Sequence, residues 1–211
     1  MKLTVLNETE LLRGVRALSR RDADLRRIYK RYGPPPLWDR EPGFATLVYI
    51  ILEQQVSLAS AKAAYARLEK ACRQKVTPRR LLTIDDAQMK AIGFSRQKMG
   101  YARELAQAIL AKQFLPEALV SMSDDAVRGE LVKLKGIGRW TADIYLMECL
   151  LRPDVWPHGD LALAAAVEKV KGLPTRPSYD ELNRMAEQWK PWRAVAARLF
   201  WHYYLSEKAN R

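Results

Sequence analysis

Apolar residues recur along most of the chain at the three- and four-residue spacing of amphipathic helices, and this periodicity restricts the fold more than any other feature. No stretch alternates apolar and polar residues between hairpin turns, as a half-buried strand would. Helical patterns follow one another with short breaks, and we expect about a dozen short helices. The sequence therefore predicts an all-α fold.

The expected helices begin and end at local signals. Asn7–Glu10 has the pattern of a capping box, Thr77 precedes a helix-starting proline, and the prolines of Gly33–Pro36 must end a helix. Phe44–Gln54 is continuously apolar and fits a buried helix or a strand, but its length and the alanine-rich helix Ser57–Cys72 after it favour a helix. Further helices are expected over residues 7–18, 22–31, 85–91, 95–111, 124–134, 139–151, 161–171, 179–188 and 192–206.

The composition excludes several classes of protein. With 211 residues and 48% hydrophobic residues, the chain can bury a substantial core and is not a disordered polymer. Its longest apolar run, Phe44–Leu52, is about half the roughly 20 residues that a membrane span needs, and its start becomes charged too early for a secretory signal. Cys72 and Cys149 lie in apolar helical pattern, which argues against a disulfide scaffold or a cysteine metal site. We expect an intracellular protein, in the cytoplasm or nucleoid if bacterial, with no membrane partner.

The charge points to a polyanionic partner. Lys and Arg number 36 against 24 Asp and Glu, giving +12. Residues 1–80 carry 17 basic and 8 acidic side chains (+9), residues 81–160 carry 10 and 11 (−1), and residues 161–211 carry 9 and 5 (+4). Nucleic acid is the first expectation for such a balance, although a basic surface can also serve solubility alone.

The segment 131–142, LVKLKGIGRWTA, joins two helical patterns within four residues. Gly136 and Gly138 can adopt positive φ and leave their amides uncovered, while Ile137 can plug the gap between the helices. The Gly138 amide would then point out from the N-terminus of the next helix, where an anion is favoured. Lys133, Lys135 and Arg139 bracket the turn, so phosphate is the natural anion. A tight turn that uses glycine for geometry alone remains the other interpretation.

A second candidate lies twenty residues beyond Trp140. Asp160 closes the motif PHGD and precedes the apolar run 161–167, so it is a good N-cap. The helix N-terminus would also keep its carboxylate ionised, as is needed to stabilise a developing cation. Both roles can hold together. His158 could join this site, but a histidine beside a proline turn is more often structural.

These segments resemble the helix–hairpin–helix DNA glycosylases of the Gly/Pro/Asp type, and above all the 3-methyladenine DNA glycosylase II branch. The resemblance is carried by LKGIGRWTA, by the Asp of HGDLAL, by LVYIILEQQVSLASAKAA (47–64) and by KPWRAVAARLFWHYY (190–204), and it runs from about Trp38 to the C-terminus. It implies two helical subdomains flanking a DNA-binding cleft, with the target base flipped into a pocket. We expect subdomain A at about 1–38 plus 165–211, and subdomain B at about 39–164 with the helix–hairpin–helix at 124–151.

The resemblance also implies roles for individual residues. Asp160 matches the catalytic Asp, and Gln55 matches the residue that wedges into the duplex where the base has left. The segment Lys135-Gly136-Ile137-Gly138-Arg139 would hold a phosphate of the lesion strand. Trp140 stands where bifunctional relatives have a Schiff-base lysine, so strand cleavage is not expected. Trp140 also shares one helical face with Ile144, Met147 and Leu151, which is the pattern of a core residue.

The base pocket is defined less sharply. Trp201 matches an aromatic wall against which the base stacks, and Trp38, Tyr49 and Trp140 are further candidates. A glycosylase of this branch known from enteric bacteria has tyrosines where this chain has Ile144 and Leu161, and this difference is consistent with a narrower or shifted substrate range. The backbone carbonyls of Leu134 and Ile137 hold a monovalent cation in some relatives. No cofactor is implied.

The sequence thus predicts a monomeric, monofunctional DNA glycosylase that acts on double-stranded DNA with a damaged base of the 3-methyladenine type. Alkylation makes the base cationic, so that it leaves without a general acid, and one carboxylate then suffices. Two alternatives stay open. One is a glycosylase for deaminated or mispaired bases, which shares every residue named above. The other is a non-catalytic helix–hairpin–helix module, which would need the turn but not Asp160.

Overall fold

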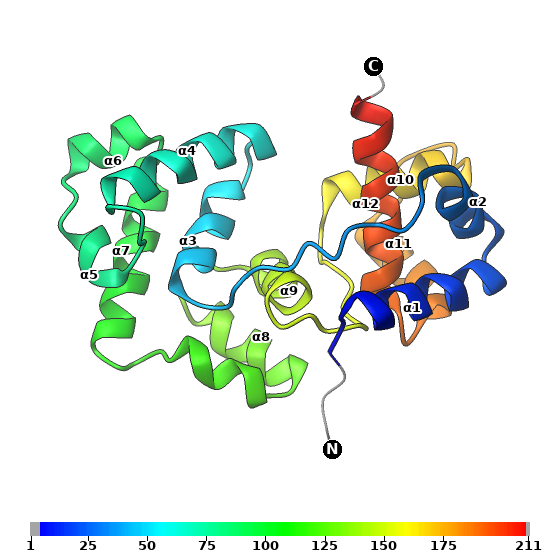
Figure 1. The fold of residues 1–211 in the computed structure, drawn as a ribbon, viewed down its shortest axis with the longest axis horizontal. Coiled ribbons are helices and arrows are strands. Elements are labelled where there is room, and N and C mark those ends of the chain that lie inside the picture. The colour runs from blue at the N-terminus through cyan, green and yellow to red at the C-terminus, as the bar shows by residue number, and fades with distance from the viewer. Residues whose placement is uncertain (1–4, 210–211) are drawn as a thin grey trace. The chain divides into compact units, whose positions relative to one another are not determined.

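The computed structural model describes residues 5–209, and every regular element in that range is helical, which confirms the all-α prediction (Figure 1). The elements are α1 (Glu8–Arg21), α2 (Ala23–Tyr32), α3 (Phe44–Glu53), α4 (Leu58–Ala71), α5 (Pro78–Leu82), α6 (Asp86–Ile92), α7 (Arg96–Leu110), the 3₁₀ helix η1 (Pro116–Ser121), α8 (Asp124–Val132), α9 (Arg139–Glu148), α10 (Leu161–Lys171), α11 (Tyr179–Ala186), the 3₁₀ helix η2 (Glu187–Trp189) and α12 (Arg193–Ala209).

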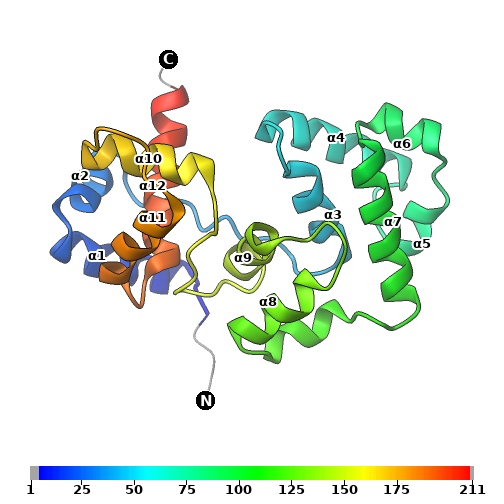
Figure 2. The same cartoon turned by 180° about the vertical axis from the view of Figure 1, so that it is seen from behind.

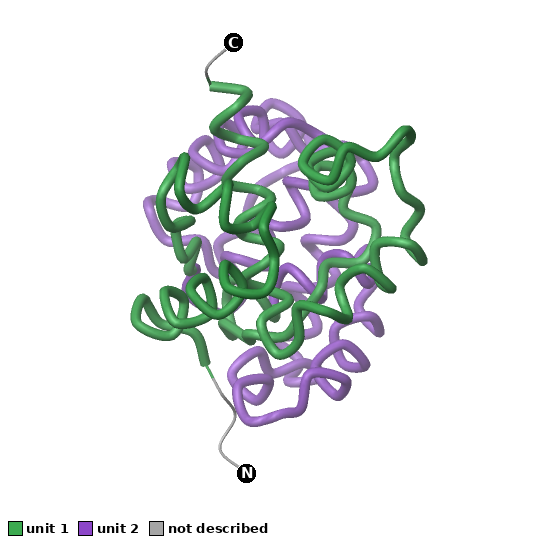
Figure 3. Tube along the Cα trace, turned by 90° about the vertical axis from the view of Figure 1, so that its right-hand side faces the viewer, with its two compact units in different colours: residues 1–39, 146–211 green, residues 40–145 purple. Residues whose placement is uncertain are grey.

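The chain forms two units, drawn in separate colours in Figure 3: unit 1 comprises residues 1–39 and 146–211, and unit 2 comprises residues 40–145. Among the described residues, no helix is both long enough and apolar enough to cross a lipid bilayer.

Unit 1 is organised around α12, which packs against α10, α2 and α1 and can be followed from both sides in Figures 1 and 2. Residues 194–200 of this helix are all buried, and three of them are alanines, which let neighbouring helices approach closely. The same stretch contains Arg198, whose side chain is entirely buried. The core of unit 1 therefore includes a charged group that the helix pattern alone does not reveal.

Unit 2 is organised around α3, which packs against α4 and α7. Leu47, Val48, Ile50 and Ile51 are completely inaccessible to solvent, so the helix is covered nearly all round. This explains why its sequence is continuously apolar, and it confirms a helix rather than a strand at 44–54.

Helix boundaries follow the capping signals of the sequence. Asn7 Oδ1 accepts a hydrogen bond from Glu10 N at 2.8 Å, and Thr77 caps the helix that starts at Pro78. Asp85 and Ser178 form capping boxes with bonds in both directions. The run of prolines ends α2 at Tyr32, as expected, with Gly33 in a positive-φ conformation.

The 3₁₀ helix at 116–121 was not predicted, because its six residues are too few to show a helical period in the sequence. Unit 2 ends at Tyr145. The expected division into subdomains, with subdomain B continuing to about 164, stays a prediction. The following residues join unit 1 through backbone bonds: Leu6 N donates to Leu151 O at 2.8 Å, and Ala194 N donates to Pro153 O at 3.0 Å. The sequence pattern of α9 does not mark this division, which falls inside the helix.

A buried carboxylate joins α2 to the rest of unit 1. Asp22 caps α2 through Asp24 N and Leu25 N, and its Oδ2 accepts from Lys171 Nζ at 2.8 Å and from Trp189 Nε1 at 2.9 Å. Burial opposes ionisation of this carboxyl, but the hydrogen bonds from Lys171, Trp189 and Leu25 outweigh it and hold the pKa of Asp22 below its ordinary value.

We predict that Asp22→Asn lowers the free energy of unfolding by about 2 kcal/mol at neutral pH, because the cap survives while the charged partner of Lys171 is lost. A carboxyl with a lowered pKa stabilises the fold above its unfolded pKa of about 4 and loses this effect as the pH falls. The variant should therefore differ from the wild type at pH 7, and the difference should shrink as the pH falls through the lowered pKa of folded Asp22. Urea unfolding over a series of falling pH tests this, and a deficit that stays constant over the series would contradict it.

Candidate functional site

The turn between α8 and α9 has a tightly packed inner side. Ile137 N donates to Leu134 O at 3.0 Å, and the Ile137 side chain is only 4% exposed. Gly136 has φ +81°, and a Cβ added there would lie 2.1 Å from the ring of Tyr101. Only glycine satisfies both the backbone conformation and this close approach. The plug expected of Ile137 and the glycine requirement at 136 are therefore present.

Gly138 behaves differently from the expectation. Its φ is not positive, and a Cβ added there would have nothing within 4 Å. Glycine at 138 is thus not required by backbone geometry or by packing within the protein. What it provides is open space in front of the N-terminus of α9, where an approaching anion would need it.

The basic residues of the turn are exposed. Lys135 Nζ lies 2.8 Å from Glu104 Oε1, and Lys133 Nζ lies 2.7 Å from Glu130 Oε1. The hydrogen bond and charge of Glu104 raise the pKa of Lys135, which keeps its amine protonated. Ion pairs this exposed contribute little to stability and can exchange for a phosphate partner. Arg139, also exposed, begins α9.

The candidate wedge, Gln55, is exposed and has φ +56°, an uncommon conformation for a residue other than glycine. Its neighbour Gln54 fixes it to the turn: Gln54 Nε2 donates to Gly136 O at 2.9 Å and lies 3.0 Å from Thr141 Oγ1. Lys98 Nζ donates to Leu52 O and Gln54 O, each at 2.8 Å. The end of α3 and the turn are thus held together within unit 2.

Sequence reasoning missed Gln54 and Lys98. The pair Gln54-Gln55 gave no sign that one amide faces inward and the other outward, and no pattern in the sequence singled out Lys98. Burial lowers the pKa of Lys98, whose amine satisfies two carbonyls that have no helical partner at the end of α3. An N-cap signal at Ser57 so soon after Gln54 was the one available indication of an abrupt turn.

Asp160 lies in unit 1 as the N-cap of α10. Its Oδ1 accepts from Leu163 N at 2.7 Å and from Trp201 Nε1 at 3.3 Å. The carboxylate is partly exposed, as is Trp201. A backbone amide and an indole N–H therefore fix its orientation, and a helix N-terminus favours its negative charge. His158 nearby packs against the ring of Tyr179, with centroids 3.8 Å apart, which supports the structural interpretation of this histidine.

Trp38 is placed beside the same group. Its ring meets that of Trp201 edge-on, with centroids 6.3 Å apart, and its φ is +49°. The preceding carbonyl, Leu37 O, accepts from Arg198 Nε at 2.9 Å. A buried arginine thus holds the peptide next to a strained tryptophan, and Asp160, Trp201 and Trp38 form one cluster within unit 1.

The other candidates for the base pocket have different surroundings. Tyr49 stacks on Tyr65 with centroids 4.4 Å apart, and Arg40 Cζ lies 4.8 Å from the Tyr49 centroid. These neighbours compete with a base for its ring faces. Trp140 is partly exposed, whereas Ile144 on the same helix is only 4% exposed. Leu161, directly after Asp160, is 74% exposed and so presents an apolar side chain beside the carboxylate.

Within residues 5–209 the protein is all-helical, with open space at Gly138 before the N-terminus of α9, an exposed Gln55 beside this turn, and in unit 1 a carboxylate beside aromatic rings. A family model confirms the class. The HhH-GPD superfamily of base excision DNA repair proteins matches residues 48–192, and the chain belongs to this superfamily.

Individual relatives agree with this assignment. The DNA-3-methyladenine glycosylase 1 of Schizosaccharomyces pombe is 28% identical over 200 residues, covering 92% of this chain and 87% of the relative. The DNA-3-methyladenine glycosylase 2 of Escherichia coli is 28% identical over 165 residues, which cover 74% of this chain and 55% of the relative. A solved structure of the S. pombe 3-methyladenine DNA glycosylase in complex with abasic DNA superimposes with a TM-score of 0.82 at 27% identity, covering 90% of this chain and 95% of that one.

The two glycines of the turn should respond differently to substitution. Gly136→Ala should destabilise the protein by about 1–3 kcal/mol, because alanine at positive φ is strained and its methyl meets Tyr101. Gly138→Ala should melt as the wild type does. The bulkier Gly138→Leu should also fold, but it should weaken binding to lesion-containing and abasic duplexes alike, since a phosphate contact carries no base information. Thermal melts and duplex titrations test this; unchanged binding by Gly138→Leu would refute the anion site.

Proposed function

We propose that this protein is a monofunctional DNA glycosylase that hydrolyses the N-glycosidic bond of alkylated bases of the 3-methyladenine type in duplex DNA, the first step of base excision repair. The observation that carries the proposal is the Asp160 carboxylate, oriented by Leu163 N and Trp201 Nε1 beside two indole rings. Membership of a base excision repair superfamily supports it, as do the names of the relatives.

The chemistry suits a site with one conspicuous acid. An alkylated purine carries a positive charge, so it departs as a neutral base without protonation. As the bond lengthens, the sugar becomes oxocarbenium-like. Asp160 stabilises this cation electrostatically and orients or deprotonates the water that attacks C1′. The bond to Trp201 keeps the carboxylate fixed, so that little reorganisation is needed as charge develops.

The aromatic rings of the cluster favour the same substrate class. An electron-poor, cationic base stacks on an indole face with a gain of about 0.5–2 kcal/mol. The bond from the Trp201 N–H to Asp160 and the partial exposure of its ring support this role for Trp201. Trp38, edge-on to Trp201, would hold that ring in place and add a second apolar surface. Tyr49 is the weakest of the proposed pocket residues, given its neighbours Tyr65 and Arg40.

We assign DNA holding to the turn and to Gln55. The Gly138 opening and the exposed Lys135 and Arg139 would take a phosphate of the lesion strand, and Gln55 would fill the gap that the flipped base leaves. Because Gln54 Nε2 donates to Gly136 O, the segment that carries Gln55 and the turn that would bind the phosphate are held together as one element.

The carbonyls of Leu134 and Ile137 could also hold a monovalent cation. Neutral carbonyl oxygens suit such an ion, and Leu134 O keeps a second lone pair after accepting from Ile137 N. A cation there would add positive charge near a bound phosphate. No catalytic step depends on it.

The most direct test of the proposal is base release from duplexes that carry 3-methyladenine, 7-methylguanine, hypoxanthine or 1,N6-ethenoadenine. Release of the first two supports alkylated-base specificity. Release of hypoxanthine alone would favour the alternative of a glycosylase for deaminated bases, and binding without any release would favour a non-catalytic DNA-binding module.

We predict that Asp160→Asn melts close to the wild type yet excises bases at least about 10²–10³-fold more slowly. Asparagine caps helices about as well as aspartate and keeps an oxygen for Leu163 N, but it removes the charge that faces the oxocarbenium. Single-turnover excision and thermal melts should be paired, and binding to an abasic duplex should survive.

Asp85→Asn is the matched control. Asp85 caps α6 through Gln88 N at 2.7 Å, so the same substitution removes a cap charge in unit 2 with no expected effect on excision. If both variants excised at the wild-type rate, Asp160 would be only a cap and the enzymatic proposal would fail.

We further predict that the product DNA retains intact abasic sites and that borohydride traps no covalent adduct. Trp140 occupies the expected position of a Schiff-base lysine, so that position offers no amine to attack C1′. Denaturing gels before and after alkali, with borohydride trapping in parallel, check this. A trapped adduct would show that another lysine is the nucleophile and would overturn the monofunctional assignment.

A further inference from the structure

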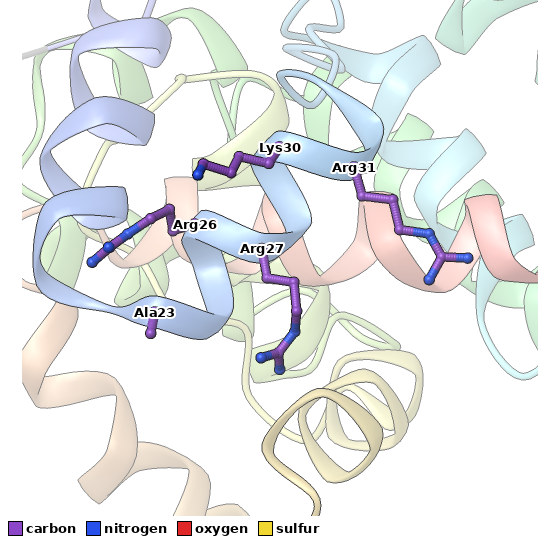
Figure 4. Close-up of a pocket in the computed structure, with 5 residues that line it drawn as sticks. All are labelled: Ala23, Arg26, Arg27, Lys30 and Arg31. Atoms are coloured by element: carbon purple, nitrogen blue, oxygen red, sulfur yellow. The ribbon is translucent and has the colours of Figure 1, made fainter.

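One charged surface of unit 1 takes no part in the site described above. Helix α2 exposes Arg26, Arg27, Lys30 and Arg31, which we call the α2 basic face. Their three- and four-residue spacing places them on one side of the helix. Together with Ala23 they line a recess of about 390 Å³, and Figure 4 shows the four side chains extending outward around it.

The face carries more positive charge than its neighbours neutralise. Arg27 pairs with Asp24 at 2.6 Å, and Arg31 pairs with Glu207 at 3.1 Å. Both carboxylates are shared, since Asp24 also lies 2.9 Å from Lys171 Nζ and Glu207 also accepts from Tyr32. Arg26 donates its Nε to the neutral Ser19 carbonyl, and Lys30 forms no ion pair within residues 5–209. At least two of the four charges are therefore uncompensated.

Local stability does not account for this arrangement. Arg26 and Lys30, like Arg27 and Arg31, are four residues apart, and each such like-charge pair costs about 0.2–0.5 kcal/mol. The helix dipole favours cations only in the last turn, and Arg27 pairs with Asp24 three residues earlier, which leaves Arg26 without either explanation. A polyanion placed across the face would remove the repulsion and use all four donors.

The face lies well away from the carboxylate site. Arg27 Nη2 donates to Val170 O at 3.3 Å, near the C-terminal end of α10, whereas Asp160 caps the N-terminal end of the same helix. Ten residues of helix at 1.5 Å each separate the two by about 15 Å. This distance is the length of about four to five base pairs of duplex.

We propose that the α2 basic face is a second DNA-contact surface, which binds the phosphate backbone of duplex DNA independently of sequence and of damage. From Ala23 to Arg31 the face is about 12 Å long, matching three to four phosphates of one strand. Three of its four cations are arginines, whose planar guanidinium matches phosphate oxygens in a bidentate manner. The inference rests on the proposed function only in taking DNA as the polyanion.

The test compares two double variants that each lose two charges. Arg26→Gln/Lys30→Gln removes the two cations without carboxylate partners, and glutamine preserves helix propensity. Arg13→Gln/Arg16→Gln, on exposed positions of α1 in the same unit, is the matched control. The affinity of each variant for an undamaged duplex is measured across a range of salt concentrations. A duplex of about 30 base pairs is long enough to reach from the Asp160 site to the α2 basic face.

The log–log salt slope should fall by about two for the α2 variant and by less than one for the control. The charge-preserving swap Arg26→Lys/Lys30→Arg should keep the wild-type slope, which separates lost charge from disturbed folding. An unchanged slope in the α2 variant, or an equal fall in the control, would overturn the proposal. The proposal would also be overturned if the α2 variant kept wild-type DNA binding but lost binding to phosphatidylserine vesicles, because the face would then bind a membrane surface.

Base excision separates this inference from the proposed function. With enzyme in excess at a saturating concentration, the α2 variant should release alkylated bases at the wild-type rate, because the face is about 15 Å from Asp160. If the wild type itself released no base, the proposed function would fall, while the salt titration on undamaged duplex would still decide whether α2 binds DNA.

Discussion

Unit 1 is assembled from two stretches of chain on either side of residues 40–145, and the buried guanidinium of Arg198 joins them. It donates to Leu37 O in the first stretch at 2.9 Å, and to Met147 O at 2.6 Å and Ala194 O at 3.1 Å in the second. Burial lowers the pKa of Arg198 to about 10, against the pull of Glu148 and Asp39, so the group stays charged at neutral pH. A buried charge is tolerated only when its hydrogen-bond donors are satisfied. The backbone that carries these three carbonyls is therefore held in position around the guanidinium.

The arrangement of the carboxylate site follows from that constraint. Arg198 precedes Trp201 by one helical turn, and it holds the peptide that leads into Trp38. Arg198 thus fixes the backbone beside Trp38 and lies on the same helix as Trp201. Trp201 in turn bonds to Asp160, which begins the helix packed against α12. The aromatic surfaces and the carboxylate are thus products of one hydrogen-bonded core, as a preorganised site requires.

The sequence predicted the helical class, most helix boundaries and the turn, because these depend on local signals such as caps, breakers and periodicity. It did not predict that Gln54 faces inward, that Lys98 closes the end of α3, or that α9 is divided between the units. Each of these depends on partners distant in sequence, as in the bonds from Gln54 to Gly136 O and from Lys98 to Leu52 O. Gly138 illustrates the opposite error, since its lack of a side chain suggested a special backbone conformation where the structure has an ordinary one with open space.

The cap role of Asp160, together with its proposed catalytic role, has an evolutionary consequence. The residue starts α10 through one oxygen, and asparagine can do the same with its amide oxygen. Aspartate and asparagine codons differ by a single nucleotide. A chain of this design therefore lies one point mutation from a folded descendant that keeps the turn, the wedge and the basic surfaces but has no carboxylate at the N-terminus of α10. Selection on stability alone would not remove such a descendant, so only selection on the proposed catalysis would favour aspartate over asparagine at this position.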